Sequence, residues 1–352
     1  MNERTVSVII PVYNAACTID DCLESLISQN QIPDEIVLID NNSSDNSIDK
    51  MNAFIAKHPD KNIILLQESK KGAASARNKG LRHTSADIIA FTDSDCIVEK
   101  DWLKNIIAKF EKGDVDAVGG MPRIYQPKSY AEILQALSWN FPDTFMGIPV
   151  ENVWDPLFGK MLGTLNCAVR KEVFEKIGLF DESLSVSGED LDLSIRIKKA
   201  GFKMIVWIEN IVVHHMPRRK YSQYLKQIFE YRNILPFLLK KHFKRTLLID
   251  LSKGRYKRFP FFLNLALSNK VIEILLFLLV IFFIKITLPA VLLVVLLVYI
   301  SVAKWIISGQ GFLRQKFSFS GVLKMSTLEI VKKIVSECGR VYGVFKHRSL
   351  YL

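Results

Sequence analysis

Paired cysteines are absent from this chain of 352 residues. Its five cysteines are scattered, odd in number and never arranged as Cys-x-x-Cys. This spacing argues against a disulfide framework and a zinc site, and it suits a reducing compartment. The first residues also lack a signal-peptide pattern and run directly into a strand-like segment. We therefore expect the amino-terminal part to stay in the cytoplasm.

Acidic residues are scarce in the carboxyl-terminal part. Residues 218–352 carry 24 Lys or Arg against 5 Asp or Glu, whereas residues 1–217 carry 23 against 31. A nucleic-acid binder would be basic throughout, so an acidic front and a basic rear indicate two environments. The rear also holds the longest apolar run, and basic residues beside apolar spans are typical of an anionic membrane surface. We expect membrane lipids as partners and no nucleic acid.

The first hundred residues alternate short β-branched runs with segments of helical period. Strands are expected near 6–12, 35–40, 62–67 and 86–92, with helices between them and a capping box at 18–21. This alternation predicts an α/β fold with a mostly parallel sheet and helices on both faces. Ligands of such sheets bind at the carboxyl ends of the strands.

Residues 117–217 are less regular. We expect strands near 117–122, 162–169 and 204–213, and helices at 171–177 and from about Ser187 to Gly201. The whole of 1–217 is therefore expected to be one catalytic domain. Residues 218–270, which mix basic and apolar side chains, are expected to form amphipathic helices at a membrane interface.

Residues 271–303 form the dominant apolar segment, which is interrupted near Lys285–Pro289. One straight helix over this stretch would be about 48 Å long, more than the roughly 30 Å of a bilayer core. Two passes or a re-entrant hairpin fit better, and the basic flanks then lie on the cytoplasmic side, with 304–352 as a basic cytoplasmic tail. A buried helical hairpin of a soluble protein is the alternative.

Polar clusters follow two of the expected strands. Asp40 ends a strand where its carboxylate can accept hydrogen bonds from a ribose or a base. No Gly-x-Gly-x-x-Gly follows the first strand, which argues against a dinucleotide. Gly72 precedes a helix that carries Arg77, and a helix start with an arginine suits a phosphate. The ordinary alternative is a charged helix surface.

A second cluster could bind a metal ion. Asp93 and Asp95 directly follow an apolar strand, and two carboxylates so placed can converge on Mg²⁺ or Mn²⁺. A solvated turn is the alternative. His214 and His215 follow another expected strand, so that one faces in and the other out, and an imidazole could join the metal.

Ser187-Gly-Glu-Asp190 opens an expected helix. Ser187 and Asp190 could form a capping box. The functional alternative is that Asp190 acts as a general base that takes the proton from an incoming hydroxyl group.

Together and in this order, these motifs resemble glycosyltransferase family 2, the inverting enzymes with a GT-A fold. The resemblance covers about residues 5–216. It rests on the opening strand and turn, the Asp40 loop, Gly72 with Ala76-Arg-Asn78, Asp93-Ser-Asp95 and Gly188-Glu-Asp190. Asn166–Arg170 and Gly178–Asp181 also look like the acceptor-side segment of the family.

The resemblance implies roles for these positions. Asp190 is the expected base, with Glu189 beside it as the second catalytic residue. Asp95, with His214 or His215, would hold the metal on the diphosphate. The expected donor-binding residues are Pro11, Tyr13, Asn14, Asp40, Asn42, Gly72, Arg77, Asp93 and Ser94. Asn41–Asn42 departs from the family, where many members carry an acid and a glycine, which affects the preference for UDP.

The sequence thus predicts an enzyme that moves a sugar from a nucleotide-sugar donor, a UDP-sugar foremost, to a lipid-linked or glycan acceptor at the cytoplasmic membrane. Its cofactor would be Mn²⁺ or Mg²⁺. A metal-dependent nucleotidyltransferase or a nucleotide-binding membrane protein is the alternative. Product analysis separates them, because sugar transfer releases a nucleoside diphosphate and nucleotidyl transfer releases pyrophosphate.

Overall fold

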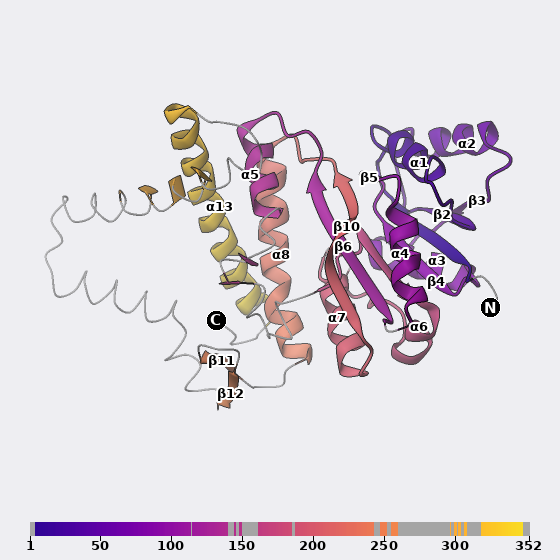
Figure 1. The fold of residues 1–352 in the computed structure, drawn as a ribbon. Helices are drawn as coiled ribbons and strands as arrows, with labels where there is room; N and C mark the ends of the chain where they lie inside the picture. Colours follow the sequence, from indigo (N-terminus) through magenta and orange to yellow (C-terminus); the bar gives the residue numbers. More distant parts are fainter. Residues whose placement is uncertain are drawn as a thin grey trace, which may run out of the picture. The chain divides into compact units, whose positions relative to one another are not determined.

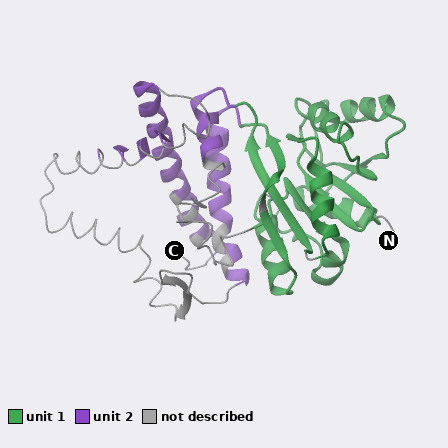
Figure 2. Cartoon of the chain, viewed as in Figure 1, with its two compact units in different colours: residues 1–126, 139–217 green, residues 127–138, 218–352 purple. Residues whose placement is uncertain are grey.

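The computed structural model describes residues 4–113, 115–139, 161–184, 187–242 and 318–347. Short pieces at 144–145, 148–149, 247–251 and 255–259 and single positions between 296 and 307 are also described. The chain divides into two compact units (Figure 2). One contains residues 1–126 and 139–217; the other contains residues 127–138 and 218–352. Residues 127–138, which were expected within the catalytic domain, therefore group with the carboxyl-terminal unit.

The first unit is built on an eight-stranded sheet in the order β3-β2-β1-β4-β9-β6-β10-β5 (Figure 1). β1 is parallel to β2 and β4, β2 is parallel to β3, and β6 is parallel to β10, whereas β9 and β5 run antiparallel to their neighbours. The strands are β1 (Val6–Val12), β2 (Glu35–Asp40), β3 (Ile63–Gln67), β4 (Ile88–Thr92), β5 (Cys96–Val98), β6 (Ala117–Ile124), β9 (Asn166–Arg170) and β10 (Met204–His215). The predicted α/β fold is confirmed.

Helices cover both faces of this sheet because its central strands are apolar on both sides. Val8 and Ile10 of β1 point into one apolar core, together with side chains of three helices, and Ile9 points into another core on the opposite face. The first core uses α1 (Ile19–Ile27), α2 (Ser47–Lys57) and α4 (Trp102–Glu111). The second uses α3 (Ala73–His83), α6 (Lys171–Ile177) and α7 (Glu189–Lys199).

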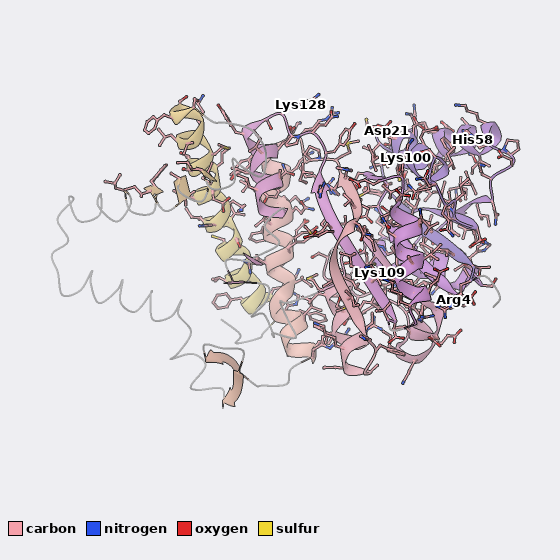
Figure 3. All side chains as sticks on the ribbon, viewed as in Figure 1. Arg4, Asp21, His58, Lys100, Lys109 and Lys128 are labelled. Carbon is pink, nitrogen blue, oxygen red and sulfur yellow. The ribbon has the colours of Figure 1, made fainter. Side chains whose placement is uncertain are left out.

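Parallel strands bring their carboxyl ends to one edge of the sheet. The ends of β1, β2 and β4 and the loops after them therefore lie together there, and they carry Asn14, Asp40 and Asp93. Arg4 marks the opposite edge, before β1, where its Nη1 donates to the carbonyl of Phe110 at 2.9 Å (Figure 3). The polar loops and this edge are thus separated by the length of the strands.

Neither the capping box predicted at Thr18 nor the one considered at Ser187 forms. The Thr18 hydroxyl donates back to the carbonyl of Ala15 at 3.3 Å and caps no amide of α1. α7 begins after Gly188, whose left-handed conformation (φ 90°) replaces the extended backbone that a capping serine needs. The Ser187 hydroxyl makes no cap hydrogen bond, so the capping box expected at Thr18 was wrong and the capping alternative for Ser187 does not hold.

In the second unit, α8 (Tyr221–His242) packs against α13 (Phe319–Lys346). Two glycines of α13 allow a close approach: a Cβ at Gly339 would lie 2.6 Å from the carbonyl oxygen of Phe229, and one at Gly343 would lie 2.2 Å from that of Asn233. α5 (Tyr130–Trp139) belongs to the same unit up to residue 138. Its Gln135 exchanges two hydrogen bonds of 2.9 Å with the Arg218 backbone.

Two short hairpins complete the elements, β7 (Thr144–Phe145) with β8 (Ile148–Pro149) and β11 (Leu247–Leu251) with β12 (Arg255–Phe259). Strands thus occupy part of 218–270, where only helices were expected. The helical hairpin predicted over 271–303 lies outside the described residues, apart from single positions. Among the helices that the structure does describe, none combines the length and the apolar composition of a membrane span.

Candidate active site

The loops after β1 and β2 are bonded to each other at the sheet edge. Asn14 has a positive φ of 50°; its amide donates to Ser43 Oγ at 3.0 Å, and its Oδ1 accepts from the Ser44 amide at 2.8 Å. Pro11 lies inside β1, and Tyr13 is 60% exposed beside the turn. An exposed tyrosine ring at the end of a strand offers a flat apolar surface for a planar base.

Asp40 is buried at the end of β2, where its Oδ1 accepts from the Ser43 amide at 3.3 Å. Asn42, with φ 67°, donates to the carbonyls of Glu68 and Ser69. Its side chain therefore shapes the loop, and the expected contact of Asn42 with the donor stays a prediction.

Asn41, which the sequence did not single out as a site residue, organises the next loop. Its Nδ2 donates to the carbonyls of Glu68 and Lys70, and its Oδ1 accepts from the Gly72 amide, all at 2.8 Å. Gly72 has φ 128° before α3, a conformation that favours glycine. The departure at Asn41–Asn42 thus has a structural consequence, because Asn41 holds the start of α3 against β2.

Arg77 is buried instead of lying on an exposed helix surface. Its side chain is 3% exposed; Nη1 donates to Glu189 Oε1 and Nη2 donates to Asp93 Oδ1, each at 2.8 Å. Burial opposes the positive charge, but the two carboxylates outweigh it and hold the pKa of Arg77 above its usual value. Each terminal nitrogen thus donates to a carboxylate, whereas the buried Nε has no partner among the described residues, and the expected phosphate contact stays a prediction.

Asp190 lies beside this ion-pair cluster, in the first turn of α7. Burial, and then the charge of Glu189, raise the pKa of Asp190 to about 7, against a lowering by Arg77 and by the Leu191 amide, which donates to Oδ1 at 2.7 Å. A carboxylate with a pKa near neutrality is suited to general-base catalysis, because it can both take and release a proton at working pH.

The two histidines at the end of β10 have different partners. His215 is buried, and its Nε2 lies 3.4 Å from Asp95 Oδ2, whereas His214 Nε2 lies 3.0 Å from Glu99 Oε1. The antiparallel pairing of His215 with Cys96 in β5 places this histidine beside the Asp95 loop. Of the two histidines, His215 is the one positioned to bind the same metal ion as Asp95.

A divalent ion fits the Asp95–His215 pair. A carboxylate oxygen and an imidazole nitrogen are donors that Mn²⁺ accepts, and ions of this type often take their remaining ligands from substrate phosphates and water. Within the described part of the chain, no group of three or more His, Cys, Asp or Glu could hold a metal alone. Burial and the nearby Asp95 raise the thiol pKa of Cys22 and Cys96.

Two buried hydroxyls at the site have no hydrogen-bond partner among the described residues. They belong to Thr92, which precedes Asp93, and Ser187, which precedes Gly188. A buried hydroxyl without a partner is costly, and such groups are often satisfied by a ligand or a water. Ser94, between the two aspartates, is also buried.

A small apolar cavity adjoins the same edge and is lined by Gly119, Gly120, Pro122, Met161, Gly163, Leu165 and Asn166. Asn166 pairs with Thr92 in the sheet, and its amide is fixed by Trp102 Nε1 at 2.8 Å and by the carbonyl of Ile211 at 3.0 Å. Its long-range partners are invisible in the local sequence pattern, and so this supporting role was not predicted.

Comparisons with known proteins point to one family. A family model described as "Glycosyl transferase family 2" matches residues 7–178. Glycosyltransferase AglE of Haloferax volcanii is 31% identical over 226 residues, which cover 64% of this chain and 70% of that protein. A Methanococcus voltae protein is 25% identical over 282 residues, which cover 77% of this chain and 83% of the relative. Its name is dolichyl N-acetyl-α-D-glucosaminyl phosphate 3-β-D-2,3-diacetamido-2,3-dideoxy-β-D-glucuronosyltransferase.

Among solved structures, the mannosyltransferase PcManGT from Pyrobaculum calidifontis, in complex with GDP-Man and Mn²⁺, has a similar fold. Its TM-score is 0.59 at 21% identity, and the match covers 96% of this chain and 88% of that one. GalNAc-T7 with UDP, GalNAc and Mn²⁺ gives a TM-score of 0.51 at 17% identity, with 68% and 48% coverage.

Proposed function

Since the chain belongs to glycosyltransferase family 2, we propose that it moves a sugar from a nucleotide-sugar donor, a UDP-sugar foremost, to a hydroxyl group of a membrane-associated glycan or lipid-linked acceptor, with inversion at the anomeric carbon. Sugar transfer follows from the family. The donor, the acceptor, the metal and the base are parts of the proposal, and each has its own support.

The observation that carries the proposal is the cluster of Asp190, Glu189, Arg77 and Asp93 at the carboxyl edge of the sheet. Asp190 takes the proton of the acceptor hydroxyl, whose oxygen attacks the anomeric carbon from the side opposite the diphosphate. Asp40 and Asp93 bind the nucleoside, and the exposed Tyr13 ring covers the base. One displacement inverts the configuration, and so no covalent nucleophile is needed.

Asp95 and His215 would hold a Mn²⁺ or Mg²⁺ ion, which supplies positive charge next to the leaving diphosphate. This assignment is supported by the 3.4 Å approach of their side chains and by the chemistry of the donor pair. The imidazole of His214 is paired with Glu99, and we assign it no role in metal binding.

A lipid-linked acceptor is supported by the Methanococcus voltae relative, whose name includes a dolichyl-linked sugar phosphate. Membrane attachment is supported by α13. Phe319, Leu323, Ile334, Val341 and Phe345 recur at helical spacing and are 40–86% exposed. With the excess of basic residues in 218–352, such a stripe suits an anionic lipid surface. We propose the cytoplasmic membrane, with the catalytic unit on the cytoplasmic side, where the donors are.

The proposal is tested by incubating the protein with UDP- and GDP-sugars, a lipid-linked acceptor extract and Mn²⁺. Release of nucleoside diphosphate with a glycosylated lipid of inverted anomeric configuration is expected, whereas release of pyrophosphate would establish the nucleotidyltransferase alternative.

In the same assay, Asp190→Asn should retain donor affinity and lose about 10²–10⁴-fold in transfer, the usual contribution of a positioned base. Near-normal transfer by folded Asp190→Asn protein would remove the residue from this role.

A further inference from the structure

Arg77 connects two parts of the site that are far apart in the sequence. Its Nη2 donates to Asp93, in the loop after β4, and its Nη1 donates to Glu189, in the first turn of α7. Asp93 belongs to the proposed donor side, and α7 carries the proposed base. Among the described arginines, Arg77 is the one that forms ion pairs with both the loop after β4 and α7.

The surroundings of Arg77 fix its position. Helix α3 packs closely against the sheet at Gly80, where a Cβ would lie 2.8 Å from the Ile9 side chain of β1. The guanidinium stacks 5.9 Å from the centroid of the Phe180 ring. The neighbouring Asn78 exchanges hydrogen bonds with the Phe180 backbone at 3.0 and 2.9 Å, which holds that ring in place. Arg77 is therefore a rigid donor on a rigid element.

From this geometry we infer that Arg77 is a positioning residue for the transfer step: it clamps Glu189 to Asp93, and thereby sets the orientation and the ionisation of Asp190 relative to the donor. Glu189 is then the anchor of the clamp and not a second base. This inference rests on the proposed function, since it assigns work within the same site.

The electrostatic part of the inference concerns the charged and titratable groups that face Asp190 among the described residues. Glu189, in its own helix, disfavours the Asp190 carboxylate, and Arg77, from α3, favours it. The thiol of Cys167 faces it from β9, and burial raises the pKa of that thiol, so that it stays neutral. Asp93 is the second carboxylate that is paired with Arg77. Removing the cation and removing the anion must therefore move the protonation of Asp190 in opposite directions.

Arg77→Gln, Glu189→Gln and a control, Arg82→Gln, test the inference. Arg82 lies on the same helix, but its side chain is half exposed and its Nη1 lies 3.8 Å from Glu182 Oε1, a long ion pair. Its replacement therefore removes a charge without removing a bond to Asp93 or Glu189. We expect the acid limb of the kcat–pH profile to move up for Arg77→Gln, down for Glu189→Gln and not at all for Arg82→Gln. The transfer rate of Arg77→Gln should fall at least tenfold at pH 7, because Asp190 is then more protonated and less well oriented.

A second readout does not require activity. The carboxyl C=O stretch that infrared difference spectra lose in Asp190→Asn protein reports the protonation of Asp190 directly, with or without a donor. The same opposite shifts are expected in this titration. If the wild-type protein transfers no sugar but the shifts occur, the proposed function fails and the clamp stands. Glu189→Gln keeps a hydrogen-bond acceptor for Arg77, and so it serves as the test if Arg77→Gln does not fold. The inference is overturned if Asp190 in the Glu189→Gln protein titrates as it does in the wild-type protein.

Discussion

At the scale of single residues, Asp190 shows how a catalytic carboxylate can lower the stability of its own protein. The pKa of Asp190 is raised to about 7 in the folded chain, from an ordinary value of 3.8, by burial and by Glu189. Below pH 3.8 both states hold the proton. As the pH rises from 3.8 to 7, the unfolded state loses this proton and the folded state keeps it, so that folding becomes less favourable.

The consequence is a stabilising substitution at the centre of the site. Asp190→Asn should raise Tm by roughly 2–8 °C at pH 8, because the amide has no charge to desolvate. The gain should be complete above pH 7 and should shrink as the pH falls toward 4. Differential scanning calorimetry of both proteins from pH 4 to pH 8 measures it. A gain that is the same at every pH would have a cause other than the ionisation of Asp190.

The two adjacent histidines make a matched pair of variants. His215 faces Asp95 at 3.4 Å, and His214 faces Glu99 at 3.0 Å. His215→Ala should therefore abolish the Mn²⁺-dependent part of donor affinity, as Asp95→Ala should. His214→Ala should change it less than about fivefold, since a partly exposed pair contributes about 1 kcal/mol or less. Calorimetric titration of the donor with and without Mn²⁺ distinguishes them. Equal losses for both histidines would contradict the assignment.

At the scale of elements, the α8–α13 pair depends on the absence of two side chains. A Cβ at Gly343 would meet the Asn233 carbonyl oxygen at 2.2 Å, and backbone cannot move aside cheaply. Gly343→Ala should therefore lower the midpoint of thermal unfolding by several degrees, as expected for about 1–3 kcal/mol of overpacking. Gly321→Ala is the control on the same helix, because its nearest neighbour is the movable Tyr130 hydroxyl at 3.0 Å. Equal effects would show that helix propensity, and not the close approach, decides.

The elements also differ in how well the sequence predicts them. β1 and α6 have the expected bounds, because an apolar run and a short amphipathic segment are local signals. The capping boxes failed at Thr18 and Ser187, since backbone conformation and competing acceptors decide a cap. The burial of Arg77 could not be predicted, because its partners lie 16 and 112 residues away in the sequence. The motifs of the site were therefore predictable, but the ion pairs that connect them were not.

At the scale of the whole molecule, α5 is assigned to the carboxyl-terminal unit although its neighbours in sequence belong to the other. Its Leu134 and Leu137 are fully buried. In the full chain, L134E/L137E should be strongly destabilising, because two buried leucines become charged. In a fragment of residues 1–217 the same double substitution should raise the soluble yield, since the fragment leaves that face without its unit. Centrifugation of both pairs of lysates gives the comparison, and a change of the same sign in both would show that α5 needs nothing beyond residue 217.

The placement of α5 also bears on how the protein is made. Residue 138 leaves the ribosome about 80 residues before residue 218, which at 5–20 residues per second is on the order of 4–16 s. Through that interval the apolar side of α5 has no finished unit to join, and β9 and β10 of the other unit's sheet have not all been synthesised. The nascent chain therefore exposes an apolar helix face while its catalytic unit is still incomplete. Ribosome-associated chaperones, or the membrane surface itself, have a natural point of engagement there, and slowing translation after residue 138 should increase misfolding more than slowing it after residue 218.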